Sequence, residues 1–133
     1  MGVGRLCREA RDLRKIDWLV VDTEGSDALV LEGASRLLLE RRVALLEFEF
    51  NRMGFWAVDS EAPRTLTRTL QVLESVGYSC FWQGAIGLAR ATTPCVLSLI
   101  SRLHPRSTLR WSNLVCSWRP QIVAALDARV VAA

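Results

Sequence analysis

The chain has 133 residues, enough for one ordinary domain with a buried core. Half of the residues are hydrophobic and 23% are charged, which is typical of a globular protein and excludes an intrinsically disordered one. The formal net charge is only +3, and the basic residues are scattered along the chain rather than clustered. This pattern favours a solvated basic surface over a nucleic-acid interface.

The cysteines and the N-terminal sequence indicate in which cellular compartment the protein is expected. Four cysteines lie far apart, with no C-x-x-C pair and a single histidine, His104, so no structural zinc site is predicted. We expect reduced, buried cysteines in an intracellular and most simply cytoplasmic protein, with a bridge between Cys95 and Cys116 as the open alternative. The sequence shows neither the apolar core of a signal peptide nor a stretch long enough to span a membrane.

The first predicted elements are a helix and a buried strand. Residues 5–14 place apolar side chains at helical spacing among charges, which predicts a short amphipathic helix in an N-terminal lead-in, residues 1–15. Residues 16–22 are almost continuously apolar and rich in β-branched side chains. Such a run is typical of a strand that is covered on both faces, as in a parallel sheet.

A helix is predicted directly after this strand. Ser26 can cap its N-terminus, and Asp27 is favourable in its first turn. Its apolar stripe is Val30, Leu31, Ala34, Leu37 and Leu38. Gly33 lies inside the helix at a cost of about 1 kcal/mol relative to Ala. We expect that its missing side chain lets the helix sit close to the sheet.

A second strand, residues 43–50, completes a βαβ unit whose two strands are expected to be parallel. After a loop, Ser60, Glu61 and Pro63 suit the start of another helix, and Gly77 suits its end. The buried stripe of this helix is Leu66, Leu70, Leu73 and Val76.

The remaining elements are two strands and a tail. Strands are predicted at residues 78–82 and 111–118, whereas residues 85–110 are poorly patterned. The C-terminal tail, residues 120–133, contains a predicted helix at 122–130. The order of strands and helices predicts an α/β fold.

Acidic side chains follow the first two strands at the point where each ends. Asp22 and Glu24 follow the first strand, and Glu49 and Asn51 end the second. Ligands of open parallel sheets bind beyond the carboxyl ends of the strands, and neighbouring strands lie about 4.8 Å apart. If these strands are neighbours, three carboxylates converge on one rim, where a cation, a hydroxyl-bearing ligand or a general base is favoured. The alternative is a solvated turn at residues 22–25.

Three further residues bear on this rim. Glu47 shares a face with Glu49 because strand side chains alternate. Trp56 lies in the loop expected over the rim and, with Asn51, is a candidate substrate contact. His104 has no serine or cysteine positioned as a catalytic partner, so a surface role is predicted for it.

A resemblance to the FkbM family of S-adenosylmethionine-dependent methyltransferases is carried by the stretch IDWLVVDTEGSDALVLEGASRLLLERRVALLEFEFNRMGFW. In that family a strand ending in D-x-E-G leads into a helix with L-x-G-A, and the next strand ends in a glutamate. The later pieces LESVGYSCFWQG and RWSNLVCSWR resemble the closing strands of the family. The resemblance covers residues 16–119.

The resemblance implies roles for the rim acids. Asp22 and Glu24 match the family's acidic signature, and Glu49 matches the acid at the end of the next strand, with Glu47 as the alternative register. It implies catalysis by these residues, S-adenosylmethionine as cofactor with Asp22 among its contacts, and a small-molecule or glycan hydroxyl as methyl acceptor.

The resemblance also implies a partial domain. The family's fold resembles the seven-stranded, Rossmann-like class I methyltransferase sheet, and the residues match strands four to seven with their flanking helices and an antiparallel last strand. We therefore expect a truncated C-terminal half of a methyltransferase, without the glycine-rich turn that cradles the cofactor and with weak or no cofactor binding alone. The alternative is a non-catalytic fragment or partner protein that associates with another chain through the open edge of strand 16–22.

Overall fold

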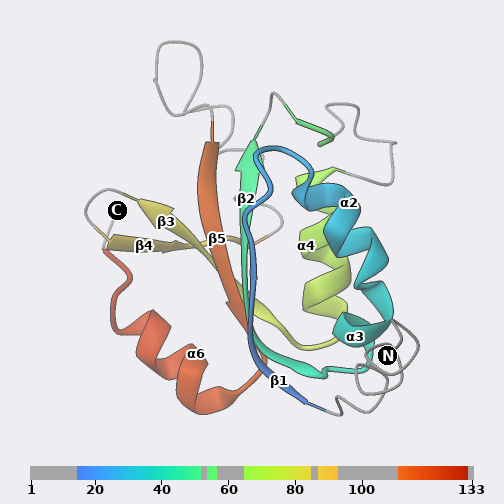
Figure 1. Cartoon of the computed structure of the whole chain (residues 1–133). Helices are drawn as coiled ribbons and strands as arrows, with labels where there is room; N and C mark the ends of the chain where they lie inside the picture. The colour runs from blue at the N-terminus through green and yellow to red at the C-terminus, as the bar shows by residue number, and fades with distance from the viewer. Residues whose placement is uncertain (1–14, 52–53, 57–64, 85–86, 93–110, 132–133) are drawn as a thin grey trace, which may run out of the picture.

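The computed structural model describes residues 15–51, 54–56, 65–84, 87–92 and 111–131. A five-stranded sheet forms its centre, in the order β1-β2-β5-β3-β4. The strands are β1 (Ile16–Val21), β2 (Val43–Asn51), β3 (Ser79–Gly84), β4 (Gly87–Arg90) and β5 (Trp111–Ser117). The helices are α2 (Asp27–Gly33), α3 (Ser35–Leu39), α4 (Leu66–Ser75) and α6 (Pro120–Asp127). Figure 1 shows α2, α3 and α4 on one side of the sheet and α6 on the other.

The strand directions agree with the sequence-based expectation. β1 and β2 are parallel neighbours, with Val21 opposite Phe48. β5 runs antiparallel to both β2 and β3. The predicted α/β class, the parallel βαβ unit and the antiparallel orientation of the strand at 111–117 are therefore confirmed. The short strand β4 was not predicted.

The side chains of β2 alternate between two environments. Leu46 and Phe48 are fully buried on the face that packs against α2, α3 and α4. Glu47 and Glu49 are partly exposed on the other face. The prediction that these two glutamates share a face is confirmed, and the packing of the apolar residues fixes which face that is.

The helix predicted after β1 is broken into α2 and α3 at Ala34. Gly33 is exposed, and a Cβ added there would meet nothing within 4 Å. The prediction that this glycine lets the helix approach the sheet is therefore wrong. Ser26 occupies the N-cap position, but its side chain makes no capping hydrogen bond.

Helix α4 begins after Thr65, whose hydroxyl oxygen accepts from the backbone N–H of Arg68 at 3.0 Å. Gly77, with a φ of 95°, follows the C-cap residue of α4 and ends this helix, as predicted. The buried stripe of α4 is Leu66, Leu70 and Leu73. Several predictions fall outside the described residues: the helix at 5–14, Cys7, Ser60, Glu61, Pro63, Cys95 and His104.

The strands β3 and β5 are covalently joined. Cys80 and Cys116 are direct partners in the antiparallel ladder and form a disulfide within the core. The prediction of reduced cysteines is wrong for this pair. The alternative bridge between Cys95 and Cys116 is also wrong, because Cys116 is already bonded to Cys80.

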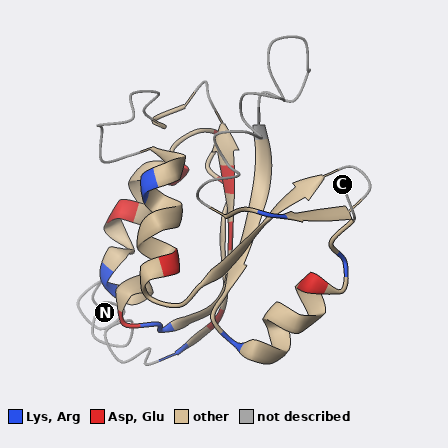
Figure 2. Cartoon of the chain, turned by 180° about the vertical axis from the view of Figure 1, so that it is seen from behind, with Lys and Arg blue, Asp and Glu red and all other residues tan. Residues whose placement is uncertain are grey.

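The described part of the chain has neither a membrane-spanning helix nor a row of basic residues along one face. No helix there is long and apolar enough to cross a membrane. Figure 2 shows the basic residues on separate elements, whereas acidic residues recur along β2.

Candidate active site

The carboxyl ends of β1 and β2 form one rim of the sheet. Asp22 directly follows β1, and the register that pairs Val21 with Phe48 brings Asp22 level with Glu49 when continued by one residue. Asp22 and Glu24 are both exposed. The two strands are therefore neighbours, which is the condition on which the predicted convergence of the rim acids depends.

The turn after β1 has an uncommon backbone that a second loop holds in place. Glu24 has a φ of 55° and Gly25 a φ of 107°. A non-glycine residue in this left-handed region costs about 1 kcal/mol or more, so neighbouring contacts must maintain it. The carbonyl of Gly25 accepts from the N–H of Phe55 at 2.7 Å, and a Cβ on Gly54 would lie 2.2 Å from the same oxygen. The loop after β2 therefore fixes the backbone from which Glu24 extends.

Asp27 ties the two strand ends together. Its carboxylate is fully buried and accepts from the N–H of Thr23 at 3.2 Å and from the Thr23 hydroxyl at 2.6 Å. Its other oxygen accepts from the backbone N–H of Glu49 at 2.9 Å. Three donors offset the cost of removing a carboxylate from water. From the sequence, Asp27 was expected only to be favourable in the first turn of a helix. The one sequence feature that could have indicated its bonds to Thr23 is its position four residues after that threonine.

The pKa of Glu49 is raised above its ordinary value. Burial is the largest cause, and the negative charges of Asp27 and Asp22 add to it. Glu24 adds a smaller contribution, and a side-chain hydrogen bond with Asn51 acts in the opposite direction. Burial and like charges both disfavour the ionised carboxylate. Glu49 therefore holds a proton more tightly than an ordinary glutamate, as suits a general base.

Glu47 has different neighbours, although it shares a face with Glu49. Its Oε1 lies 3.4 Å from the side-chain amide of Gln83 and 3.5 Å from that of Asn113. These amides belong to β3 and β5, on the side of β2 away from the acids that follow β1. Glu49 is thus the glutamate whose carboxyl is surrounded by the other rim acids.

Asn51 and Trp56 have separate roles at the end of β2. Asn51 contacts the Glu49 carboxyl, as the opposing hydrogen bond indicates. Trp56 is 3% exposed, packs its ring against Phe48 and Phe50, and donates its indole N–H to the Glu49 carbonyl at 3.1 Å. The structure therefore places Trp56 in the core, where it supports β2, and not over the rim as a substrate contact.

Among the described residues, no group of three or more His, Cys, Asp or Glu side chains could hold a metal ion.

Comparison with known protein families tests the family resemblance that these residues suggest. Residues 4–80, more than half of the chain, match the family model described as the methyltransferase FkbM domain. The chain belongs to the FkbM methyltransferase family. No curated protein and no solved structure matched it.

The FkbM match covers the N-terminal part of the chain. It includes β1, the turn with Asp22 and Glu24, β2 with Glu49, and α4. It ends at residue 80 and so does not extend over β5, which lies within the predicted range of 16–119. The rim is therefore contained in the matched residues.

Proposed function

We propose that the chain carries the acceptor side of an S-adenosylmethionine-dependent methyltransferase site, and that the methyl group is transferred to a hydroxyl oxygen. The observation that carries this proposal is the pairing of β1 with β2, which brings Glu49 to a rim shared with Asp22 and Glu24. The raised pKa of Glu49 in these surroundings supports it. In a chain of a methyltransferase family, such a carboxyl is suited to take the proton of an acceptor hydroxyl.

The strand arrangement supports a partial class I sheet. β1, β2, β3 and β5 would supply its strands four to seven, with β5 as the antiparallel last strand. Within the described residues, no glycine-rich turn follows a strand in the manner of a nucleotide cradle. The contacts of the cofactor's adenosine part are therefore not assigned to this part of the chain.

The rim residues divide the chemistry among them. S-adenosylmethionine supplies a methyl group activated by the positive charge on its sulfur. The carboxylates of Asp22 and Glu24 match the cationic end of that cofactor in charge, and Asp22 is the residue we assign to it. Glu49 accepts the proton of the acceptor hydroxyl while Asn51 orients its carboxyl. A small polyol or a glycan offers hydroxyls that suit these oxygen acceptors.

The test is methyl transfer from radiolabelled S-adenosylmethionine, at high cofactor concentration, to a panel of polyhydroxylated acceptors. Glu49→Gln keeps the size of the side chain but cannot take a proton, so kcat should fall about 10²- to 10⁴-fold with little change in acceptor KM. The rate of the wild type should rise with pH through the raised pKa of Glu49. That pH-dependent rise should be absent in the variant.

Glu47→Gln is the matched control, because it lies on the same strand and face but among amides rather than acids. It should leave kcat close to the wild-type value. Asp22→Asn should lower turnover with a modest effect on folding, since Asp22 is exposed. Equal losses in Glu47→Gln and Glu49→Gln, or unchanged turnover in Glu49→Gln, would contradict the assignment.

The second candidate function is a non-catalytic partner that associates through β1, and the observation that favours it is the position of β1 at the edge of the sheet. We expect S-adenosylmethionine alone to raise the Tm of the chain little, because stabilisation follows ligand affinity for the folded state. The activity assay separates the two candidates. Product formation by the wild type supports the enzyme, and a wild type that forms no product but binds another chain through β1 supports the non-catalytic partner.

A further inference from the structure

The residues that flank Glu49 on its two neighbouring strands differ in charge. Toward β1 lies Asp22, which is level with Glu49 when the parallel register is continued by one residue. Toward β5 lies Asn113, which is directly opposite Glu49 in the antiparallel ladder. Glu49 therefore separates an acidic side of the rim from a side that carries a neutral carboxamide. A carboxamide both donates and accepts hydrogen bonds, so it suits an uncharged polar ligand.

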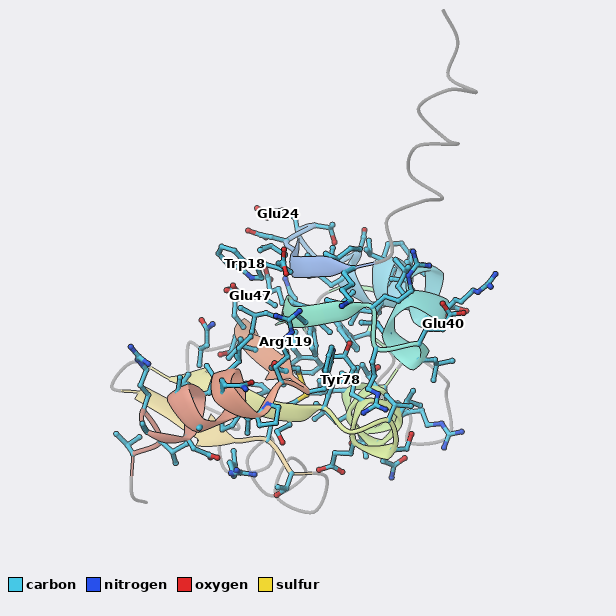
Figure 3. The ribbon with its side chains drawn as sticks, turned by 90° about the horizontal axis from the view of Figure 1, so that it is seen from below. Trp18, Glu24, Glu40, Glu47, Tyr78 and Arg119 are labelled. Atoms are coloured by element: carbon cyan, nitrogen blue, oxygen red, sulfur yellow. A yellow bond between two sulfur atoms is a disulfide. The ribbon has the colours of Figure 1, made fainter. Side chains whose placement is uncertain are left out.

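Asn113 is close enough to Glu49 for one ligand to contact both side chains. Residues that are directly opposite each other in an antiparallel pair lie on the same face, with Cβ atoms about 5 Å apart. Glu47, Glu49 and Asn113 therefore share one face of the sheet. Figure 3 shows Glu47 on the side of the sheet where α6 lies. Both Glu49 and Asn113 are partly exposed on this face.

The hydrogen bonding of Asn113 leaves its side-chain oxygen available. Its Nδ2 lies 3.5 Å from Oε1 of Glu47, which is longer than an ordinary hydrogen bond. The oxygen is on the other side of the amide carbon from Nδ2, so it is directed away from Glu47. It has no hydrogen-bond partner among the described residues. No buried side-chain oxygen or nitrogen of these residues lacks a partner, so this oxygen is in contact with solvent.

We propose that Asn113 binds the methyl acceptor together with Glu49, and that the acceptor is a vicinal diol, a molecule with hydroxyls on adjacent carbons. One hydroxyl donates to the Glu49 carboxylate, and the neighbouring hydroxyl donates to the side-chain oxygen of Asn113. Adjacent hydroxyls can reach two groups that lie side by side, whereas hydroxyls on opposite carbons of a ring cannot. This inference rests on the proposed methyl transfer and names the substrate class of the same site.

The proposed step methylates one hydroxyl and retains the other. The oxygen of the hydroxyl bound to Glu49 forms a bond to the methyl carbon of S-adenosylmethionine. The bond between that carbon and sulfur breaks, its electron pair remains on the sulfur, and the hydroxyl proton passes to the Glu49 carboxylate. The products are a monomethyl ether of the diol and S-adenosylhomocysteine. Asn113 exchanges no proton, and it fixes the position of the hydroxyl that reacts.

Asn113 belongs to a part of the chain that the family match does not cover. Glu49 lies within the matched residues 4–80, whereas Asn113 lies beyond them on β5. The position of Asn113 is nevertheless well defined, because β5 pairs with β2 and is joined to β3 by the disulfide between Cys80 and Cys116. The acceptor preference assigned here is therefore a property of this chain and not of the segment that it shares with its family.

The test compares two isomers of cyclohexanediol, one with hydroxyls on adjacent carbons and one with hydroxyls on opposite carbons. Both have the same number of hydroxyls, so a difference in rate reports how the hydroxyls are placed. For the full chain with radiolabelled S-adenosylmethionine, kcat/KM should be about tenfold higher for the adjacent isomer, because one more hydrogen bond is formed. Asn113→Ala should remove this preference, chiefly by raising KM for the adjacent isomer.

Gln83→Ala is the matched control. The carboxamide of Gln83 also contacts Glu47, at 3.4 Å, but it belongs to β3, which β5 separates from β2. This variant should keep the preference for the adjacent isomer. Equal kcat/KM values of the wild type for the two isomers would overturn the proposal, as would a preference that survives in Asn113→Ala. Loss of the preference in both variants would also overturn it, because both amides would then act only through Glu47.

Nuclear magnetic resonance measures acceptor binding without methyl transfer. The side-chain amide signals of Asn113, assigned by their absence in Asn113→Ala, should shift when the adjacent isomer is added and stay in place with the opposite isomer. Such a shift without any methylated product would contradict the proposed methyl transfer and leave the diol site standing. Product formed equally well from both isomers would leave methyl transfer standing and overturn the diol site. The absence of a shift would overturn the diol site in either case.

Discussion

Asp27 and Glu49 are joined by one hydrogen bond, from the Glu49 N–H to the Asp27 carboxylate, yet their carboxyl groups have opposite surroundings. The Asp27 carboxylate is fully buried and accepts from three donors. The Glu49 carboxyl is partly exposed, lies among other acids and has a raised pKa. The comparison indicates two roles. A carboxylate that accepts several hydrogen bonds holds the strand ends together, whereas a carboxyl surrounded by like charges can take part in proton transfer.

The largest expected effect comes from removing the structural acid. Asp27→Ala leaves the Thr23 N–H, the Thr23 hydroxyl and the Glu49 N–H without their acceptor, so the free energy of unfolding should fall by about 3 kcal/mol. Urea unfolding measures the loss. Asp22→Ala, an exposed acid of the same turn, should change stability by less than about 0.5 kcal/mol. Equal losses in the two variants would remove the distinction between a structural and an available acid.

A smaller effect is expected when the available acid is neutralised. The folded-state pKa of Glu49 is raised, so the folded protein binds its proton more tightly than the unfolded chain does. Stability therefore falls as pH rises from the ordinary glutamate pKa through the raised one. Glu49→Gln lacks this loss and should be more stable than the wild type above that window, by less than about 1 kcal/mol because solvent screens the partly exposed group.

Thermal unfolding of Glu49→Gln and the wild type across this pH range measures the difference. The two Tm values should converge below about pH 4, where the wild-type carboxyl is protonated in both states. A variant that is less stable than the wild type at neutral pH would contradict the environment assigned to Glu49.

The sequence was sufficient for the features that depend on local pattern. The apolar run of β1 and the alternation along β2 predicted two strands, and the helix between them required a parallel crossover. That crossover places Asp22 level with Glu49. The fold class therefore followed from chain order and spacing, whereas the meeting of the rim acids also required β1 and β2 to be neighbours.

Features that depend on tertiary register could not be predicted in the same way. Cys80 and Cys116 are partners because of how β3 aligns with β5, and no spacing in the sequence encodes that alignment. Trp56 was expected over the rim, but its ring packs into the core beside Phe48 and Phe50. Asp27 was missed because a first-turn aspartate in a helix is usually exposed, whereas this one is buried and bonded to Thr23 in the turn after β1 and to the backbone of Glu49 in β2.

The central claim is that Glu49 holds its proton more tightly than an ordinary glutamate because its carboxyl is partly buried and because other acids lie around it. Carbon-13 NMR can follow its carboxyl carbon during a pH titration, with the signal assigned by its loss in Glu49→Gln. We predict a midpoint above the ordinary glutamate value of about 4.3, and a lower midpoint in Asp22→Asn, because the Asp22 charge contributes to the rise. A wild-type midpoint at or below the ordinary value, or one that Asp22→Asn leaves unchanged, would contradict the claim.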